Sequence, residues 1–304
     1  MKRTKRFVVS ILALSVVLSG FTVLPLVFHN GIAAAKDKGK PVSSGKLRVM
    51  SYNLRYASDV PPNSWEERRP VMRKLLQRKR PDVIGTQEGV YHQLKHIHQD
   101  LPGYEWIGLG REGGSKGEFM AVFYNANRLQ PQEYDHYWLS DTPEVIGSTS
   151  WGNTIPRMVT WVRFLDVKTK KEFYLVNTHF DHVSEEAREK SARLIVERAL
   201  DFDPELPIVL TGDFNTGPST APYETLVNDG SFVDLWESAD KRIGEGLGTF
   251  NGFEDVTGGG AEQRIDWIMA RGSVTAKTIE ISNFQQHGQF PSDHFPVVAD
   301  IKMR

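Results

Sequence analysis

Cysteine is absent from this chain of 304 residues. The protein therefore has no disulfide, no lipid-modified cysteine and no thiolate nucleophile. A cysteine-free protein that is exported fits a bacterial envelope or medium better than a eukaryotic secretory route, where disulfides are common.

An excess of positive charge is also missing. The chain has 37 Lys and Arg against 38 Asp and Glu, and four of the basic residues lie within residues 1–35. Without that segment, 33 basic residues face 38 acidic ones and the net charge is −5. Sequence-independent binding to nucleic acid depends on Lys and Arg neutralising phosphates, so this balance argues against broad duplex binding.

The N-terminus has the layout of an export signal. Basic residues at positions 2, 3, 5 and 6 precede an apolar stretch from Phe7 to Phe28, and Ala33 to Ala35 supply small residues for cleavage. This order is typical of a signal peptide over residues 1–35. The apolar stretch is also long enough to span a bilayer as an uncleaved anchor. We expect a bacterial protein that is secreted, extracellular or in the cell envelope, with membrane anchoring as the alternative.

The rest of the chain indicates one α/β domain. Residues 36–45, rich in Lys, Gly and Ser, predict a flexible spacer, and no linker-like break interrupts residues 46–304. The sequence predicts helices over 64–79, 91–100, 184–201 and near 222–228. Strands predicted over 119–124, 133–139, 159–167 and 173–177 follow one another without a helix. Hairpins beside strand–helix–strand units imply two mixed β-sheets packed face to face with helices outside.

Polar motifs stand at the ends of the strand-like runs. The motifs are Ser51-Tyr52-Asn53, Thr86-Gln87-Glu88, Asn177-Thr178-His179, Gly212-Asp213-Phe214-Asn215 and Ser292-Asp293-His294, with Arg264-Ile265-Asp266 between the last two. Such groups are costly to bury without partners. Converging strand ends with only carboxylates, amides and imidazoles indicate one site for a hard metal and an activated water.

All six motifs, in this order, resemble those of the endonuclease/exonuclease/phosphatase superfamily, over essentially all of residues 46–304. The resemblance is to an uncharacterised bacterial secreted branch near the deadenylase-like members. It implies a four-layered α/β sandwich and a phosphoesterase that depends on Mg²⁺, with Mn²⁺ as a substitute. It also implies in-line attack of an activated water on phosphorus.

The resemblance assigns the metal to three residues. Glu88 matches the principal Mg²⁺ ligand, Asn53 lies in the outer reach of the metal, and Asp293 adds a carboxylate beside them. One Glu with supporting groups is enough, because Mg²⁺ keeps several of its waters. Glu88 has an alternative role as a cap of the helix that begins near Tyr91.

The resemblance also assigns five catalytic residues. Asp213 orients or deprotonates the attacking water, and Asn215 holds a phosphate oxygen. His294 pairs with Asp266 and acts as a general base or as a charged clamp on the phosphoryl group. His179 binds a phosphate oxygen or protonates the leaving group. An Asx-turn is the alternative explanation for the Asp213 and Asn215 motif.

Other polar residues have weaker assignments. Arg157 is expected to bind a phosphate of the substrate or to form a surface ion pair. Arg55 stands where some nuclease relatives carry an acidic residue, which puts a second carboxylate-supported metal position in doubt. Asp181 and His182 are expected to cap the helix after Ser184, with contact to the substrate as the alternative. A polar helix face explains the three histidines His92, His96 and His98 better than a zinc site does.

The sequence leaves the substrate open. Among phosphodiesters and phosphomonoesters, the resemblance favours nuclease-type activity on nucleic acid, the family's main activity. A phospholipid or sphingomyelin head group, which fits an exported enzyme, is an alternative, as is a small phosphate ester. A small phosphate ester needs neither a basic surface nor a membrane-binding hairpin. A catalytically silent binding module on the same fold is a further alternative. We expect a monomer that contacts a membrane only if the N-terminal segment stays uncleaved.

Overall fold

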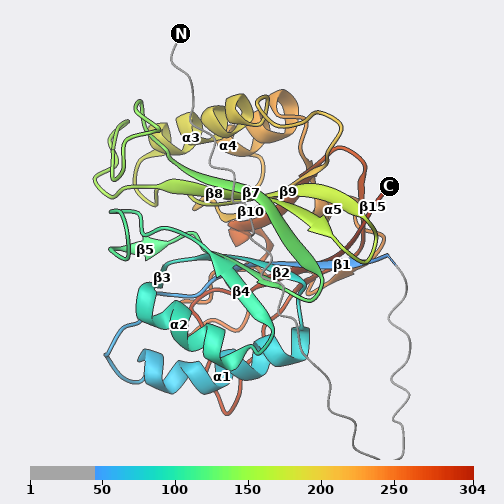
Figure 1. Cartoon of the computed structure of the whole chain (residues 1–304). Helices are drawn as coiled ribbons and strands as arrows, with labels where there is room; N and C mark the ends of the chain where they lie inside the picture. The colour runs from blue at the N-terminus through green and yellow to red at the C-terminus, as the bar shows by residue number, and fades with distance from the viewer. Residues whose placement is uncertain (1–44) are drawn as a thin grey trace, which may run out of the picture. The chain divides into compact units, whose positions relative to one another are not determined.

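Two β-sheets packed against each other form the centre of the protein, with helices outside them (Figure 1). The computed structural model describes residues 45–304, which belong to one compact unit. The signal peptide or anchor predicted over 1–35 lies outside the described residues, as does the predicted spacer except for Gly45.

The first sheet has seven strands. In spatial order they are β12 (Arg242–Ile243), β14 (Val274–Ile281), β15 (Val297–Met303), β1 (Leu47–Asn53), β2 (Val83–Gln87), β6 (Val122–Asn125) and β4 (Tyr104–Ile107). Strand β1 runs parallel to β2 and antiparallel to β15, so the sheet is mixed.

The second sheet has six strands. In spatial order they are β11 (Val233–Asp234), β13 (Asp266–Arg271), β10 (Ile208–Asp213), β9 (Lys171–His179), β8 (Met158–Asp166) and β7 (Leu129–Trp138). Strand β10 is parallel to β9 and antiparallel to β13. A separate two-stranded ribbon joins β3 (Gly89–Val90) to β5 (Glu118–Phe119).

Helices cover the outer face of each sheet (Figure 1). Helices α1 (Trp65–Lys79) and α2 (Tyr91–Asp100) lie on the first sheet, and α3 (Glu185–Arg198) and α4 (Ala221–Glu224) lie on the second. The remaining short helical segments are η1 (Thr225–Asp229), α5 (Leu235–Ser238) and η2 (Ala261–Gln263). The predicted four-layered α/β sandwich is confirmed.

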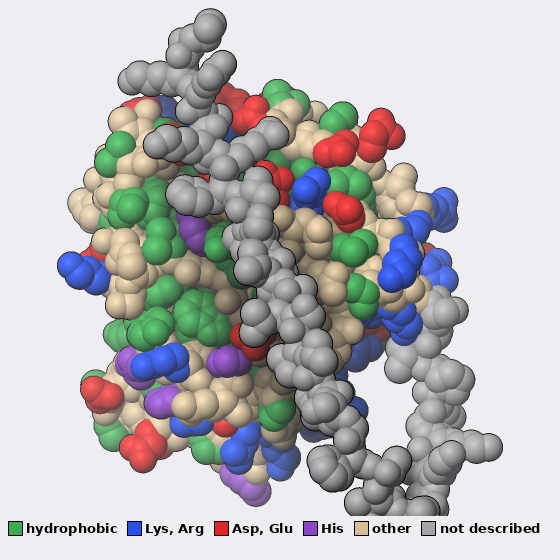
Figure 2. All heavy atoms as spheres, in the orientation of Figure 1, with side chains coloured by type: hydrophobic (Ala, Val, Ile, Leu, Met, Phe, Trp, Pro, Cys, Tyr) green, Lys and Arg blue, Asp and Glu red, His purple; other side chains and the backbone are tan. Residues whose placement is uncertain are grey.

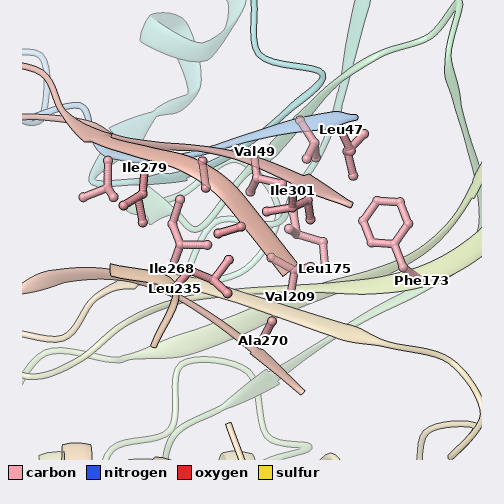
Figure 3. Packing of buried hydrophobic residues seen from close by; sticks show 14 of the residues in the cluster. Leu47, Val49, Phe173, Leu175, Val209, Leu235, Ile268, Ala270, Ile279 and Ile301 are labelled. Carbon is pink, nitrogen blue, oxygen red and sulfur yellow. The ribbon is translucent and has the colours of Figure 1, made fainter. Parts of the chain in front are cut away.

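Apolar side chains fill each gap between layers. The central cluster includes Val49, Leu175, Val209 and Ile268, from strands of both sheets (Figure 3). A second cluster packs α1 and α2 on the first sheet, and a third packs α3 on the second. No helix within residues 45–304 combines the length and apolar character needed to cross a bilayer.

Local signals explain where the main helices begin. Ser64 caps α1: its hydroxyl accepts from the N–H of Glu67, and the Glu67 carboxylate accepts from the N–H of Ser64. Ser184 caps α3 in the same way through the N–H of Ala187. Helix α3 ends at Arg198, earlier than expected, so Leu200 lies beyond the helix and is 75% exposed.

The strand predicted over 119–124 is divided into β5 and β6. Residues 118–119 pair with β3, whereas residues 122–125 pair with β2 and β4. Between them, the carbonyl of Ala121 accepts from the N–H and hydroxyl of Thr86 and from Nδ2 of Asn177. These three donors hold the carbonyl where the chain changes partner strand.

Candidate active site

Strand register brings the polar motifs of the second sheet together. Asp213, at the end of β10, lies opposite His179 of β9 on one side and Asp266 of β13 on the other. In the first sheet, parallel pairing sets Asn53 of β1 beside Gln87, so Glu88 follows next to it. The predicted residues converge because β1, β2, β9 and β10 end at one edge of the sandwich, and the antiparallel strand β13 begins there.

A cavity of about 360 Å³ opens at this edge. The predicted residues that line it are Glu88, Arg157, His179, Asp213, Asn215, Asp293 and His294. Asn53 and Asp266 lie behind this wall and hydrogen-bond to it. A separate groove of about 490 Å³ beside Lys79 and Asp300 contains none of the predicted residues.

Glu88 and Asp213 form the acidic wall of the cavity. Asn53 Nδ2 donates to Glu88 Oε1 at 2.9 Å and to Asp213 Oδ2 at 2.8 Å, while its Oδ1 accepts from the N–H of Arg55. Asn53 thus presents its donor to the two carboxylates and holds them close together. Glu88 does not cap α2, because the Gln93 side chain accepts from the N–H of Val90 there.

Two groups of side chains in residues 45–304 lie close enough to share a metal ion. One is Glu88, His179 and Asp213; the other is Asp213, Asp266 and His294, with ligand atoms within 4.8 Å of one another in each group. The carboxylate oxygens of both groups are donors of the kind that hard divalent metals prefer, and imidazole is a ligand of other divalent metals. Asp293 belongs to neither group, and its Oδ2 lies 3.5 Å from Nε of Arg55.

His294 is held between two carboxylates. Its Nδ1 lies 2.8 Å from Asp266 Oδ2, and its Nε2 lies 3.7 Å from Asp213 Oδ2. Burial lowers the pKa of His294, but Asp266 and Asp213 outweigh burial and raise that pKa well above its usual value. The imidazole is therefore positively charged at neutral pH, with Nε2 facing the cavity.

The surroundings of Asp213 raise its pKa. Burial and the neighbouring Asp266 carboxylate raise the pKa of Asp213 to about 7, although His294 and Asn53 counteract them. Its Oδ1 accepts from the N–H of Asn215. The Asx-turn considered from the sequence is thus present, and it leaves Oδ2 turned toward the two histidines.

His179 is neutral beside the charged His294. Burial, Arg157 and His294 lower the pKa of His179 well below its usual value. Its Nε2 faces the cavity, 3.0 Å from Nδ2 of Asn215 and 3.4 Å from Oδ2 of Asp213. Asn215 also donates to the carbonyl of Phe180, which fixes its amide next to the ring.

Three residues at the cavity have left-handed backbone conformations. Arg55, Glu88 and Asn215 have φ of 51°, 61° and 51°. Such conformations are unfavourable for residues with a Cβ and persist where surrounding contacts enforce them, often at functional sites. Here the carbonyl of Arg55 is held by Arg68 and Gln93, and the N–H of Asn215 by Asp213.

Arg157 forms an ion pair, but in the interior and not at the surface. Its side chain is 4% exposed, with Nε 3.5 Å from Asp181 Oδ2 and Nη2 2.9 Å from His182 Nδ1. Asp181 Oδ1 accepts from the N–H groups of Val183 and Ser184 just before α3. The expected capping by Asp181 and the pairing of Arg157 therefore share one carboxylate.

Sequence reasoning missed the buried Arg68. This residue of α1 has no exposed surface, and its guanidinium donates five hydrogen bonds to backbone carbonyls. The acceptors are Leu54, Arg55, Tyr56, Asn63 and Pro291. Its position one turn from both Trp65 and Met72, on the apolar stripe of α1, was the available signal.

The helix histidines contact neighbouring side chains. Nε1 of Trp65 donates to Nδ1 of His96, and the rings of His92 and His96 meet edge to face with centroids 6.0 Å apart. His98 Nε2 lies 3.5 Å from Glu105. These contacts explain the three histidines as parts of the surface of α2.

Comparison with known proteins agrees with this geometry. Residues 50–294 match the Endonuclease/Exonuclease/phosphatase family. The chain belongs to this family. Its members hydrolyse phosphoester bonds with the help of a metal ion, so the chain is a hydrolase of phosphoesters and has groups that can bind a metal.

Two solved bacterial structures are similar over most of the family domain. A family member from Bacteroides thetaiotaomicron is 36% identical with a TM-score of 0.81, covering 86% of this chain and 99% of that one. A mannosyl-6-phosphatase from Bacteroides thetaiotaomicron VPI-5482 is 36% identical with a TM-score of 0.78, covering 84% of this chain and 99% of that one.

An uncharacterized protein of Acanthamoeba polyphaga mimivirus is 32% identical over 175 residues, which span 54% of this chain and 64% of that protein. The match thus covers just under two thirds of this curated relative.

Proposed function

We propose that the protein is a Mg²⁺-dependent phosphomonoesterase that acts on a small phosphate ester such as a sugar phosphate. The size of the active-site cavity carries this proposal. At about 360 Å³ it is at the lower end of the range for small-molecule sites. The similarity to a mannosyl-6-phosphatase over 84% of the chain supports the same substrate class.

A nucleic-acid substrate has less support. Residues 36–304 carry a net charge of −5. On the part of the face that is uncovered in Figure 2, acidic and basic side chains both occur, with hydrophobic ones between them. Extended binding of a polyanion depends on a basic surface, so the small ester is favoured over the nuclease substrate.

The metal fits the acidic wall of the cavity. Glu88 and Asp213 bring two carboxylates to one Asn53 amide, and His179 lies beside them. A Mg²⁺ ion held by Glu88 and its neighbours neutralises charge on the phosphoryl oxygens when it is bound. Arg55, 3.9 Å from Glu88 and 3.5 Å from Asp293, offsets part of the negative charge on this wall.

The side chains around the cavity have separate roles in the reaction. The charged His294 directs its Nε2–H toward the phosphoryl group and acts as a clamp, not as a base, because its pKa is raised. Asp213, with a pKa of about 7, orients the attacking water and accepts its proton. Asn215 and His179, whose side chains lie 3.0 Å apart, hold phosphoryl oxygens.

A substrate panel with metal control tests this proposal. The protein is assayed on mannose 6-phosphate, single-stranded RNA, duplex DNA and sphingomyelin, before and after chelation. We expect hydrolysis of the sugar phosphate, its loss after chelation, and its return with Mg²⁺ or Mn²⁺. Full activity after exhaustive chelation contradicts the proposed dependence on a metal. Cleavage of RNA or DNA without hydrolysis of the sugar phosphate contradicts the proposed substrate class.

We also propose that the enzyme acts outside the cytoplasm, because residues 1–35 have the layout of a signal peptide. If a signal peptidase removes this segment, the mature chain begins at about Lys36 in the exported soluble fraction. If it stays, the protein is held at the membrane by its apolar stretch. Sequencing the N-terminus of the native protein distinguishes the two, and a cytoplasmic protein that begins at Met1 contradicts both.

A further inference from the structure

The active-site cavity extends beyond the metal and phosphoryl groups. Part of its wall is formed by Arg111, Glu118, Arg157 and His182, which we call the charged subsite. The proposed catalytic steps give these four residues no role. They come from three loops and one short strand that meet only in the folded chain.

The β3–β5 ribbon places the charged subsite next to the metal wall. Val90 pairs with Glu118, and Gly89 with Phe119, so Glu118 lies beside the segment that follows Glu88. Arg111 binds Glu118 through both terminal nitrogens, at 2.6 and 3.2 Å, and its N–H donates to the Glu118 carbonyl. Trp138 Nε1 donates to the Arg111 carbonyl at 2.7 Å, which ties this loop to β7.

Glu118 keeps unused acceptor capacity. A carboxylate has about four lone-pair positions, and Arg111 occupies one on each oxygen. Its side chain is 17% exposed and lines the cavity. A ligand hydroxyl at this wall therefore finds an acceptor that is already oriented by a bidentate guanidinium.

Arg157 and His182 supply the donors. Arg157 uses Nε for Asp181 and Nη2 for His182 Nδ1, and within residues 45–304 its Nη1 has no hydrogen-bond partner. Because Nδ1 of His182 accepts from the guanidinium, the ring proton lies on Nε2, a second donor. Asp181, 2% exposed, fixes Arg157 in place.

An oriented carboxylate beside oriented donors matches a hydroxyl group, which donates and accepts at once. We propose that the charged subsite binds the hydroxyl groups of a sugar or polyol, the alcohol part of the phosphomonoester. This inference rests on the proposed phosphomonoesterase function and specifies its substrate.

Paired substrates separate recognition of the alcohol from phosphoryl chemistry. Mannose 6-phosphate carries hydroxyl groups, whereas phenyl phosphate presents none to the subsite. For Glu118→Gln and His182→Ala, we expect KM for mannose 6-phosphate to rise about tenfold to a hundredfold, the range for a lost hydrogen bond to a charged group. We expect KM for phenyl phosphate to change less than about twofold, and kcat for both to stay near the wild-type value.

Controls keep the outcomes distinct. Glu112→Gln changes an exposed carboxylate of the same loop and should leave both KM values unchanged. His182 is exposed, so its variant is expected to fold even if Glu118→Gln does not. If the wild type hydrolyses sugar phosphates but both variants leave the ratio of the two KM values unaltered, the subsite is refuted while the proposed function stands. If the wild type hydrolyses no phosphomonoester, the proposed function itself fails.

Discussion

At the scale of single residues, the active site separates the charges of two histidines. His294 lies against Asp266 and Asp213 and is charged, whereas His179 lies near Arg157 and His294 and is neutral. Both rings are almost fully buried, so burial alone cannot explain the difference. The neighbours decide it: carboxylates favour the imidazolium and cations oppose it.

The carboxylate behind His294 gives a direct test. We expect Asp266→Asn to keep the shape of the pair but remove the negative charge, so the pKa of His294 falls and its clamp weakens. kcat should drop by about 10²–10⁴-fold, the range for loss of an acid–base or electrostatic group. NMR titration of the His294 ring measures the pKa, steady-state kinetics measure kcat, and thermal unfolding is the control for folding. An unchanged pKa of His294 in a folded variant contradicts the assignment.

At the scale of elements, helix α1 covers the first sheet and also supports the active site through Arg68. Arg68 reaches from this helix to carbonyls on both sides of the site, after Asn53 of β1 and before the Ser292-Asp293-His294 motif. Ser292 Oγ also donates to the carbonyl of Asn53 at 2.7 Å. Together these bonds join two catalytic segments that are 239 residues apart in the sequence.

We therefore expect Arg68→Met to lower the free energy of unfolding by more than about 3 kcal/mol, since each carbonyl left buried without a donor costs about 1–3 kcal/mol. Arg69→Met is the matched control on the same helix. Arg69 is partly exposed and pairs with Asp100, so its loss should cost about 0–1 kcal/mol. Urea unfolding of both variants measures the difference. Equal losses in the free energy of unfolding would show that the hydrogen bonds of Arg68 to carbonyls contribute little to stability.

At the scale of the whole molecule, polar contacts cross the apolar interface and fix how the sheets meet. Gln87 of the first sheet donates to Asn177 of the second at 2.7 Å, and Thr211 donates to the same oxygen. At another edge, Arg128 binds Asp82 and Asp166, which belong to different layers. Buried polar groups need their partners, so these contacts favour one alignment of the sheets.

The Arg128 cluster predicts how stability depends on pH. Burial raises the pKa of Asp166, but Arg128, the N–H of Lys168 and the Thr169 hydroxyl outweigh burial and hold that pKa below its usual value. A lowered pKa in the folded state means that the carboxylate stabilises the fold above its unfolded pKa of about 3.9 and loses this effect as pH falls.

Asp166→Asn should accordingly be less stable at pH 7 and lose less stability than the wild type as pH is lowered through about 4. Asp240→Asn, which removes an exposed partner of Lys277, should change little. Denaturant unfolding at several pH values tests this, and parallel pH profiles for wild type and Asp166→Asn would contradict it.

The layers, the strand ends and the chemical types at the site follow from local features of the sequence. Apolar runs and capping residues such as Ser64 and Ser184 are local signals, and the order of polar motifs carried the family resemblance. Asn53 and Asp213 were identified because each ends a run that must be buried, whereas His294 lies in the loop before β15 and was identified by its motif.

The surroundings of those residues, in contrast, depend on how the chain packs. The charge states of His179 and His294, the burial of Arg157, the bonds of Arg68 and the place of Glu118 depend on neighbours far along the chain. Periodicity specifies which face a side chain takes, but not which strand lies beside it. Register and sheet packing supply that partner, and the partner sets the pKa, the hydrogen bonds and the shape of the site.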